Sequence, residues 1–532
     1  MEQKINRSEI IKRVIQFILC TTLVVIDVAR NFGGWQMMLA SQAIGLILGG
    51  IIILHYGPKK FLKPYHLVWP ILCSIAIMVM HIPSVRGLIP WYSWYEAWLS
   101  AFNICLFGMI ITSLLIDVIK DKKVHSRKKV SLLLIIWLAY ILLATIVPDN
   151  TFRPGFYLLY FSVFYFIPFS RKESEELAED LTNGAIAGFW FFQIIAFFVR
   201  PYVQELERYQ GMYYNSNTYD LMCLVVMIFI LVKATKARRT HKVRSWNYIF
   251  WLIQYAVVFS LIVLSVGRAS IILAVAGTVF YGIIVLLIFD KLSFKKVTAT
   301  IGMLLMITIL AFPVTFSCAS YLPRILKRPV SFQDEYYKWG DLNAQENYVS
   351  FGQVLELTFG RFATLFFDYQ EVEINQEGLA ERDELPMDPN WETATYYYDE
   401  DDYNSTDLRI AIWRTYTDNL NMWGHKAAEW GVWVAPHEYI MHAHNIYIMQ
   451  AYVYGIPAGI LFIGWTILYL IQAWKYMIVN RKKELALLPL LFMILLIGYG
   501  MFDLNCMYGQ ISWAVVLFLQ KLLINKNDSV NI

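Results

Sequence analysis

The chain has 532 residues, of which 58% are hydrophobic and only 16% are charged, and its formal net charge is +4. A soluble domain carries about 25% charged residues, so water-soluble cores are not expected to hold this much apolar surface. The composition therefore predicts a protein whose solvent is largely lipid. The six cysteines lie within or at the ends of apolar runs and form no Cys-x-x-Cys pair, which predicts buried structural thiols and leaves the redox compartment open.

Apolar runs long enough to cross a bilayer recur along the whole chain. Each run has roughly 17–25 residues, the length that spans a hydrocarbon core of about 30 Å. Their centres lie near residues 22, 45, 73, 107, 139, 161, 191, 225, 257, 279, 308, 459, 493 and 515. The first run follows a basic segment without a small-residue cleavage site, so we interpret it as a span and not as a signal peptide. We expect an all-α polytopic membrane protein with about 14 transmembrane helices, or 12 if two runs are re-entrant.

The basic residues alternate between the segments that join these runs. Of the 45 Lys and Arg residues, 30 fall in every second segment, beginning with the N-terminal one. The positive-inside rule then places both termini in the cytoplasm and the long polar segment near 320–442 outside. We expect three parts: a bundle of about 11 spans over 1–319, an outer loop domain containing helices over 320–443, and about three spans over 444–532.

The outer loop is acidic and rich in aromatic residues. It holds 22 acidic and 9 basic residues, a local balance of −13, which argues against a nucleic-acid partner. Its Tyr and Trp residues could stack on sugars, although packing at the membrane surface is the simpler interpretation. The acidic run Asp399–Asp402 could bind a divalent cation, but a solvated acidic turn is the favoured interpretation.

A lone arginine interrupts the apolar sequence between residues 248 and 289. Arg268 is the only charged residue in this stretch, which as one helix would be about 63 Å long. The stretch must therefore contain two spans that reverse at Gly267-Arg268. A single guanidinium at such a hairpin is costly unless it is paired, so Arg268 is a candidate functional residue. The alternative is a residue that reaches the membrane interface without a specific role.

Two more polar segments reach the same predicted outer face. Segment 200–220 offers Arg208 and Asn217 just before a span, although its asparagines could simply cap the next helix. Segment 406–426 places Arg409, Trp413 and Arg414 at helical spacing, which predicts an amphipathic helix on the outer surface. Arg409 is a second candidate functional residue, with a plain surface charge as the alternative.

The loop returns to the membrane at HAHNIYIMQAYVYGIP, residues 442–457. His442 and His444 are two residues apart and would not share a helix face, so this spacing does not favour a zinc site. One histidine acting as a general base is the more economical hypothesis, because imidazole titrates near neutral pH. The alternative is a histidine that caps the helix at the interface.

Three segments in this order resemble the O-antigen ligase / Wzy-type polysaccharide polymerase superfamily, whose members are polytopic inverting glycosyltransferases of the GT-C type. They are Ser265-Val-Gly-Arg-Ala-Ser270, then Arg409-x-x-x-Trp413 with a glycine turn at Gly424, then His442-x-His444-Asn445-x-Tyr447 with Gly455-Ile-Pro457. The matched region runs from about 205 to 470 and includes a Gly-then-Asn segment, Gly211 to Asn217. The sequence departs from the family pattern at Val266-Gly267, at His425-Lys426 and at Val453, which leaves the subfamily open.

The resemblance implies an enzyme that takes a glycan from an undecaprenyl-diphosphate carrier and passes it to an acceptor hydroxyl. It implies His444 as the base, with Arg268 and Arg409 as a clamp for the diphosphate leaving group. Substrate contacts are then expected from five weaker candidates: Arg208, Asn217, Lys426, Asn445 and His442. No metal or other cofactor is expected, because guanidinium groups can replace a cation at a phosphate.

The implied partners are the lipid-linked oligosaccharide, an acceptor glycan, the bilayer and other polysaccharide-assembly proteins. The implied location is the bacterial cytoplasmic membrane, with the site on its outer side. A polymerase of repeat units is the favoured function and a ligase of finished glycans is the close alternative. A flippase or transporter is the alternative of another class, and it is disfavoured because the polar residues gather at one edge instead of mid-membrane.

Overall fold

The computed structural model describes most of the chain. The described residues are 7–30, 37–82, 94–120, 132–146, 160, 162–203, 208–213, 215–240, 245–326, 348–363, 388–389, 396–397, 405–426, 431–504 and 510–524. Helices dominate among them, and they form two compact units. The first unit comprises residues 1–139, 152–188 and 506–532, and the second comprises 140–151 and 189–505.

The first unit is a helical bundle. Its helices are α1 (Arg7–Arg30), α2 (Met37–Tyr56), α3 (Val68–Met80), α5 (Trp94–Lys120), α18 (Ile511–Ile524) and the first parts of α6 (Leu132–Ile146) and α8 (Arg171–Val199), with short 3-10 turns at Pro58–Leu62 and Pro64–His66. Helix α2 packs against α1 and α5, and α3 packs against α5. Gly184 lets α8 approach α1 closely, because a Cβ there would lie 2.9 Å from the Cβ of Cys20.

Polar pairs tie the helices of this unit together. Arg13 of α1 donates two hydrogen bonds to Asp180 of α8, at 2.7 and 2.6 Å. The buried ammonium of Lys521 in α18 donates to the carbonyls of Tyr165 and Ile167, at 2.7 and 2.8 Å. A buried charge of this kind is tolerable because each polar partner replaces a lost water.

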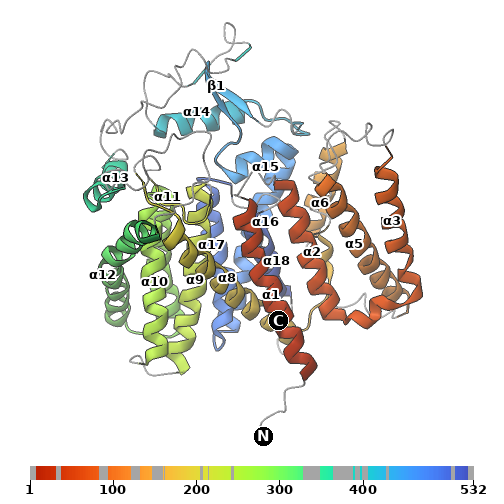
Figure 1. The fold of residues 1–532 in the computed structure, drawn as a ribbon, viewed down its shortest axis with the longest axis horizontal. Coiled ribbons are helices and arrows are strands. Elements are labelled where there is room, and N and C mark those ends of the chain that lie inside the picture. Colours follow the sequence, from red (N-terminus) through yellow and green to blue (C-terminus); the bar gives the residue numbers. More distant parts are fainter. Residues whose placement is uncertain are drawn as a thin grey trace. The chain divides into compact units, whose positions relative to one another are not determined.

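The second unit carries the segments singled out from the sequence. Its elements are α9 (Ser216–Thr240), α10 (Trp246–Leu264), α11 (Arg268–Tyr281), the π-helical η5 (Gly282–Phe289), α12 (Phe294–Leu326), α13 (Phe351–Ala363), α14 (Ser405–Asp418), β1 (Val432–Ala435), β2 (Glu438–Ile440), α15 (Ile446–Tyr454), α16 (Ile456–Val479), the 3-10 turn η9 (Glu484–Leu487) and α17 (Leu488–Gly500). Helix α10 packs between α9 and α12, and α17 packs against α9 and α11 (Figure 1).

Eight of the described helices are long and apolar enough to cross a membrane. They are Leu39–Tyr56, Trp98–Asp117, Arg171–Val199, Ser216–Thr240, Trp246–Leu264, Arg268–Phe289, Phe294–Ile325 and Ile456–Val479. Shorter apolar helices occur at Pro64–Met80, Leu132–Ala144, Glu484–Gly500 and Ile511–Ile524. A described helix covers every predicted centre except the one at residue 161, where residues 160 and 162–166 are helical and residue 161 itself lies outside the described residues. The helical class is thus confirmed, and a count of 14 spans stays a prediction.

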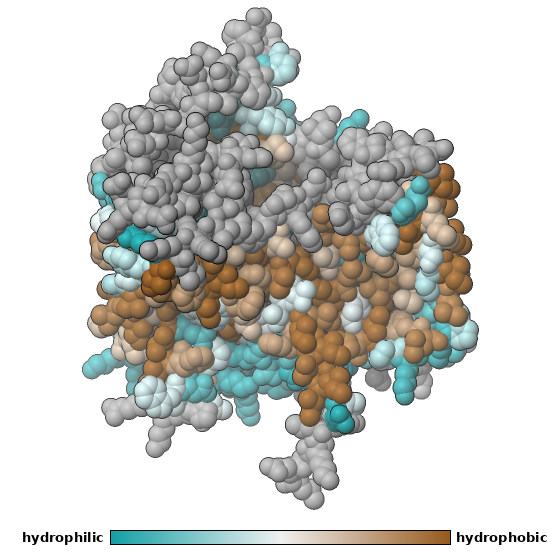
Figure 2. Space-filling model, viewed as in Figure 1, coloured by the Kyte–Doolittle hydropathy of each residue, from teal (hydrophilic) through white to brown (hydrophobic). Residues whose placement is uncertain are grey.

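Large apolar side chains remain exposed on these helices. Examples are Ile71 of α3, Leu115 of α5 and Ile309 of α12, which are 57%, 57% and 71% exposed. Figure 2 shows hydrophobic residues over much of the visible helical surface. Water would oppose such exposure and hydrocarbon would not, so the surface supports a membrane protein.

The outer segment, which was predicted to contain helices, also contains two short strands. They form an antiparallel hairpin of β1 and β2, with Val432 opposite Ile440 and Trp433 opposite Tyr439. Helix α14 packs against β1 and α15, and the described part of this segment lies in one compact unit with the helices that follow it. The division into three parts at 319 and 443 stays a prediction.

Candidate functional site

A polar cleft lies within the second unit and encloses about 440 Å³, counting the open space at its mouth. It is lined by residues from four places in the chain: Arg208 and Asn217 before and in α9, Val266–Ser270 at the start of α11, Arg409 of α14, and Tyr499, Phe502 and Asp503 at the end of α17. The three arginines predicted from the sequence therefore converge on one cleft.

The wall that carries Arg268 is a tight reversal between α10 and α11. Helix α10 ends at Leu264 and α11 begins at Arg268, as the lone arginine predicted. Val266 has a φ of 54°, a conformation that a β-branched residue rarely adopts. Gly267 is required by a close approach, because a Cβ there would lie 2.1 Å from Oδ2 of Asp220. The turn is thus a strained feature held by its surroundings, as is common at functional sites.

Arg208 is engaged in holding this turn. Its Nε donates to the carbonyl of Ser265 at 2.7 Å, and one Nη donates to Oδ1 of Asn217 at 2.9 Å. The same Nη lies 3.4 Å from Oδ2 of Asp220, a buried carboxylate at the start of α9. Asn215 Oδ1 accepts from the backbone N–H of Asn217 at 2.7 Å, the capping role considered for these asparagines. Arg208 and Asn217 therefore shape the cleft wall with groups that are already paired.

Arg409 reaches the cleft from α14. This helix is amphipathic as predicted, with Ala411, Ile412 and Tyr416 buried and Arg414 exposed. Within the described part of the chain, Arg409 has no hydrogen bond or ion pair to a side chain, whereas the Arg414 guanidinium lies 4.1 Å over the ring of Tyr397. Arg409 thus adds a positive charge to the lining of the cleft.

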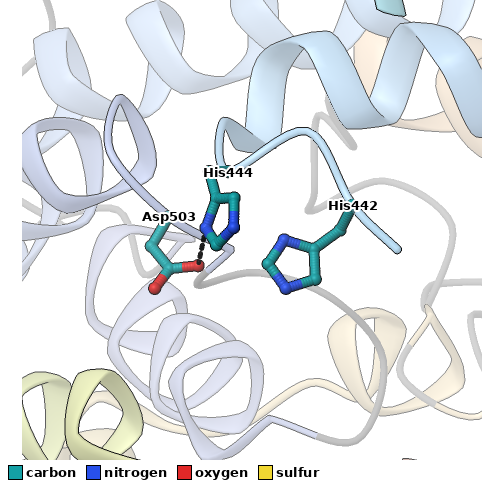
Figure 3. Close-up of side chains that lie close together, drawn as sticks. All are labelled: His442, His444 and Asp503. Carbon is teal, nitrogen blue, oxygen red and sulfur yellow. Dashed lines mark ion pairs between the residues drawn. The ribbon is translucent and has the colours of Figure 1, made fainter. Parts of the chain in front are cut away.

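The histidines lie in the loop that leads into α15. Asn445 caps that helix: its Oδ1 accepts from the N–H groups of Tyr447 and Ile448 at 3.0 and 3.2 Å, and its Nδ2 donates to the carbonyl of Met501 at 3.3 Å. His444 has a φ of 45°, so the chain bends sharply just before the cap. The rings of His442 and His444 meet edge to face, with centroids 4.1 Å apart (Figure 3).

Asp503 joins the histidines to the cleft. The Nδ1 of His444 lies 3.6 Å from Oδ1 of Asp503, which itself lines the cleft (Figure 3). Burial opposes ionisation of Asp503, but the adjacent His444 and His442 outweigh it and lower the pKa of this carboxyl. The sequence analysis missed Asp503, and the one available signal was an acidic residue directly after the apolar run of α17.

His442 is a largely enclosed imidazole beside His444. Burial, together with repulsion from His444, lowers the pKa of His442 to about 4. His442 therefore stays neutral near pH 7, and its ring supports His444 without adding a charge.

Lys426 lies apart from the cleft on an exposed turn, and it is absent from the cleft lining. The turn packs against the break between α15 and α16 through two glycines with φ values of 83° and 94°, Gly424 and Gly455. A Cβ on Gly424 would lie 2.1 Å from the carbonyl O of Val453, and one on Gly455 would lie 2.0 Å from that of Met422. Helix α16 alone covers the predicted span near 459, and the glycine turn of the outer segment packs against the break that separates α15 from it.

The assembled site can bind an anion beside a proton acceptor. The guanidinium groups of Arg268 and Arg409 carry forked donors that match phosphate or carboxylate oxygens, whereas Arg208 is engaged with Ser265 and Asn217. The His444–Asp503 pair provides an imidazole held by a carboxylate, the arrangement of a general base and its orienting group. His442, His444 and Asp503 could also hold a metal ion, because one ligand atom from each lies within 4.8 Å of the others. The acidic run Asp399–Asp402, predicted to be a solvated turn with cation binding as the alternative, lies outside the described residues. No family model, no curated protein and no solved structure matches this chain.

Proposed function

We propose that the protein is a membrane glycosyltransferase that moves a glycan from a polyprenyl-diphosphate carrier to an acceptor hydroxyl. The observation that supports this most strongly is the convergence of Arg208, Arg268 and Arg409 on a cleft that also holds Asp503, the partner of His444. The motifs that resemble the O-antigen ligase / Wzy-type superfamily supply Arg268, Arg409 and His444. We place the site at the outer face of a bacterial cytoplasmic membrane, with both termini inside.

The arginines suit the leaving group. As the glycosidic C–O bond to the carrier breaks, the diphosphate leaves with the bonding electrons and gains negative charge. Arg268 and Arg409 would bind its oxygens through paired N–H groups, and these bonds would strengthen as the charge develops. Arg208 would act mainly by fixing the turn that presents Arg268, because its own donors are bound to Ser265 and Asn217. No metal ion is required for this step, because the guanidinium charges serve the diphosphate directly.

His444 suits the acceptor side of the reaction. The acceptor oxygen would attack the anomeric carbon while its proton passes to the imidazole, and attack opposite the leaving group inverts the configuration. General-base assistance of this kind is worth about 10²–10⁴ in rate. Asp503 would orient the ring and stabilise the imidazolium that forms. Asn445 would position His444 by capping α15, since its side chain is already engaged.

The favoured acceptor is the growing glycan, which makes the protein a polymerase of lipid-linked repeat units. The large outer segment could hold a sugar chain, which favours this function over ligation of a finished glycan to lipid, protein or wall. The two functions share the same donor and the same chemistry at the cleft, so they differ only in the acceptor.

The test is a reconstituted transfer assay. The full-length protein in lipid nanodiscs would be mixed with an undecaprenyl-diphosphate oligosaccharide, with and without EDTA. A ladder of lengthening products is expected, whereas a single transfer to an added acceptor would indicate a ligase. Movement of the donor across proteoliposomes without any transfer would indicate a transporter.

The assignment of roles is tested with variants in the same assay. His444→Ala and Arg268→Ala should lose most of the transfer activity. Full activity in either variant would refute the mechanism.

A further inference from the structure

The cluster of His442, His444 and Asp503 offers more than a base and its partner. The two histidines come from the loop before α15 and the carboxylate comes from the turn after α17, so residues distant in the chain meet here (Figure 3). One ligand atom from each lies within 4.8 Å of the others. The Nδ1 atom of His442 is buried without a hydrogen-bond partner among the described residues, and the buried Nδ1 of His444 has only the 3.6 Å contact to Asp503, which is too long for a hydrogen bond. Buried polar atoms are normally satisfied, so two such atoms in one cluster point to a missing partner.

We propose that these three side chains form a binding site for a divalent transition-metal ion of the zinc class. Two imidazole nitrogens and one carboxylate oxygen form a donor set that Zn²⁺ and its first-row neighbours accept. Magnesium and calcium are disfavoured, since they prefer sites made of oxygen donors. The backbone N–H of Leu504 donates to Oδ1 of Asp503 at 2.7 Å and so already orients the carboxylate, as second-sphere groups do at metal sites.

The geometry allows such a site after a small closure. With metal–ligand bonds near 2.0–2.1 Å, tetrahedral ligand atoms are about 3.3 Å apart, so the widest pair would approach by roughly 1.5 Å. The histidines lie on an irregular loop and not on a helix, so rotation of their rings can supply most of this movement. Three protein ligands leave one position for water, and Asp503 places the site beside the cleft. The neighbouring arginines repel a cation, so binding should be weaker than at a closed structural zinc site.

The site would make zinc an inhibitor and not a cofactor, a consequence that depends on the proposed function. A metal ion and the acceptor proton would compete for the imidazole of His444. Bound zinc would thus leave no lone pair for proton transfer. Chelators should preserve or raise the transfer activity, and added zinc should lower it.

The binding test uses full-length protein without a histidine tag, stripped of metal and held in nanodiscs. Titration with Co²⁺ would be followed by its visible absorption, and titration with Zn²⁺ by calorimetry. We expect one ion per chain for the wild type and at least a tenfold weaker affinity for His442→Ala, His442→Gln and Asp503→Asn. His81→Ala is the matched control, because His81 is an exposed histidine at the end of α3 whose Nδ1 bonds to the carbonyl of Ile77. Its affinity should equal that of the wild type.

Two outcomes would overturn the proposal. One is equal metal binding by the wild type and by both His442 variants, if circular dichroism shows that these variants are folded. The other is no binding by the wild type at metal concentrations that saturate ordinary three-ligand sites. The transfer assay tests the proposed function independently of the metal site. Zinc binding without any transfer activity would refute the proposed function but not the metal site. Transfer activity without zinc binding would refute the metal site but not the proposed function.

Discussion

Nδ1 of His444 lies 3.6 Å from Oδ1 of Asp503, and this contact joins the loop before α15 to the turn after α17. A second link runs in parallel, because the side chain of Asn445 donates to the carbonyl of Met501. The two links fix the imidazole beside a cleft that three arginines reach from other segments. The position of His444 therefore depends on a residue that contributes no motif of its own.

Asp503→Asn should lower kcat by about 10- to 100-fold with little change in KM, because the acidic partner acts through His444 and not on bound donor. Asp503→Glu should recover part of the lost kcat, since it restores the charge. Steady-state kinetics of transfer measure both values. An equal loss in kcat and gain in KM, without rescue by glutamate, would indicate a merely structural residue.

Arg409→Ala should lower the transfer rate by about 10²–10³, the usual loss when one charge-stabilising donor is removed. Arg409→Lys should recover only part of the rate, because an ammonium lacks the forked donors that match a diphosphate. The control is Arg414→Ala on the same helix, where the guanidinium stacks over Tyr397. Initial rates should separate the two positions, and equal effects would exclude a special role for Arg409.

Gly267→Ala should destabilise the protein by about 1–3 kcal/mol, the range for overpacking a closely packed position. The added Cβ would lie 2.1 Å from Oδ2 of Asp220, so the turn or the carboxylate must move. The matched control is Gly302→Ala in α12, where no neighbour lies within 4 Å and alanine favours the helix. Melting temperatures in nanodiscs would show a fall for the first variant and none for the second.

Gly455→Ala should destabilise the protein for two reasons, backbone strain and a steric clash. Gly57→Ala is the matched control, because it meets the strain without the clash. Gly455 and Gly57 have similar backbone angles, φ 94° with ψ 156° and φ 83° with ψ 130°, so alanine at either position meets backbone strain of about 1–3 kcal/mol. At Gly57 the Cβ has no neighbour within 4 Å, whereas at Gly455 it would lie 2.0 Å from the carbonyl O of Met422. Gly455→Ala should therefore lower the melting temperature clearly more than Gly57→Ala. Equal shifts would mean that the turn at 421–425 can move away.

The helices and the arginine turn could be predicted from the sequence because both follow from the free energy of burial. An apolar run of sufficient length has few alternatives to a helix in lipid, and a lone Arg268 in such a run forces a reversal. Arg409 could be placed on a helix by its spacing from buried neighbours. These features are local, so the sequence displays them directly.

Other parts of the site depend on contacts between distant segments. An acidic residue after an apolar run resembles an ordinary helix end, which is why Asp503 was missed. The spacing of His442 and His444 was judged against a helix face, whereas the bend at His444 brings both rings together in a loop. The hairpin of β1 and β2 has strands of four and three residues, too short for an alternating pattern to be recognised.

Gly424 and Gly455 lie at the two ends of segment 425–454, each packed closely against the backbone of the other end. The backbone N–H of Ile456 donates to the carbonyl of Asn421, and that of His425 donates to the carbonyl of Val453. The two ends of segment 425–454 therefore lie side by side. A segment whose ends meet can change in length without displacing the helices outside it. Segment 425–454 contains the β1–β2 hairpin, His444 and α15. The hairpin could therefore be lengthened or replaced between two fixed glycines, while His444 and α15 stay held by their links to the end of α17.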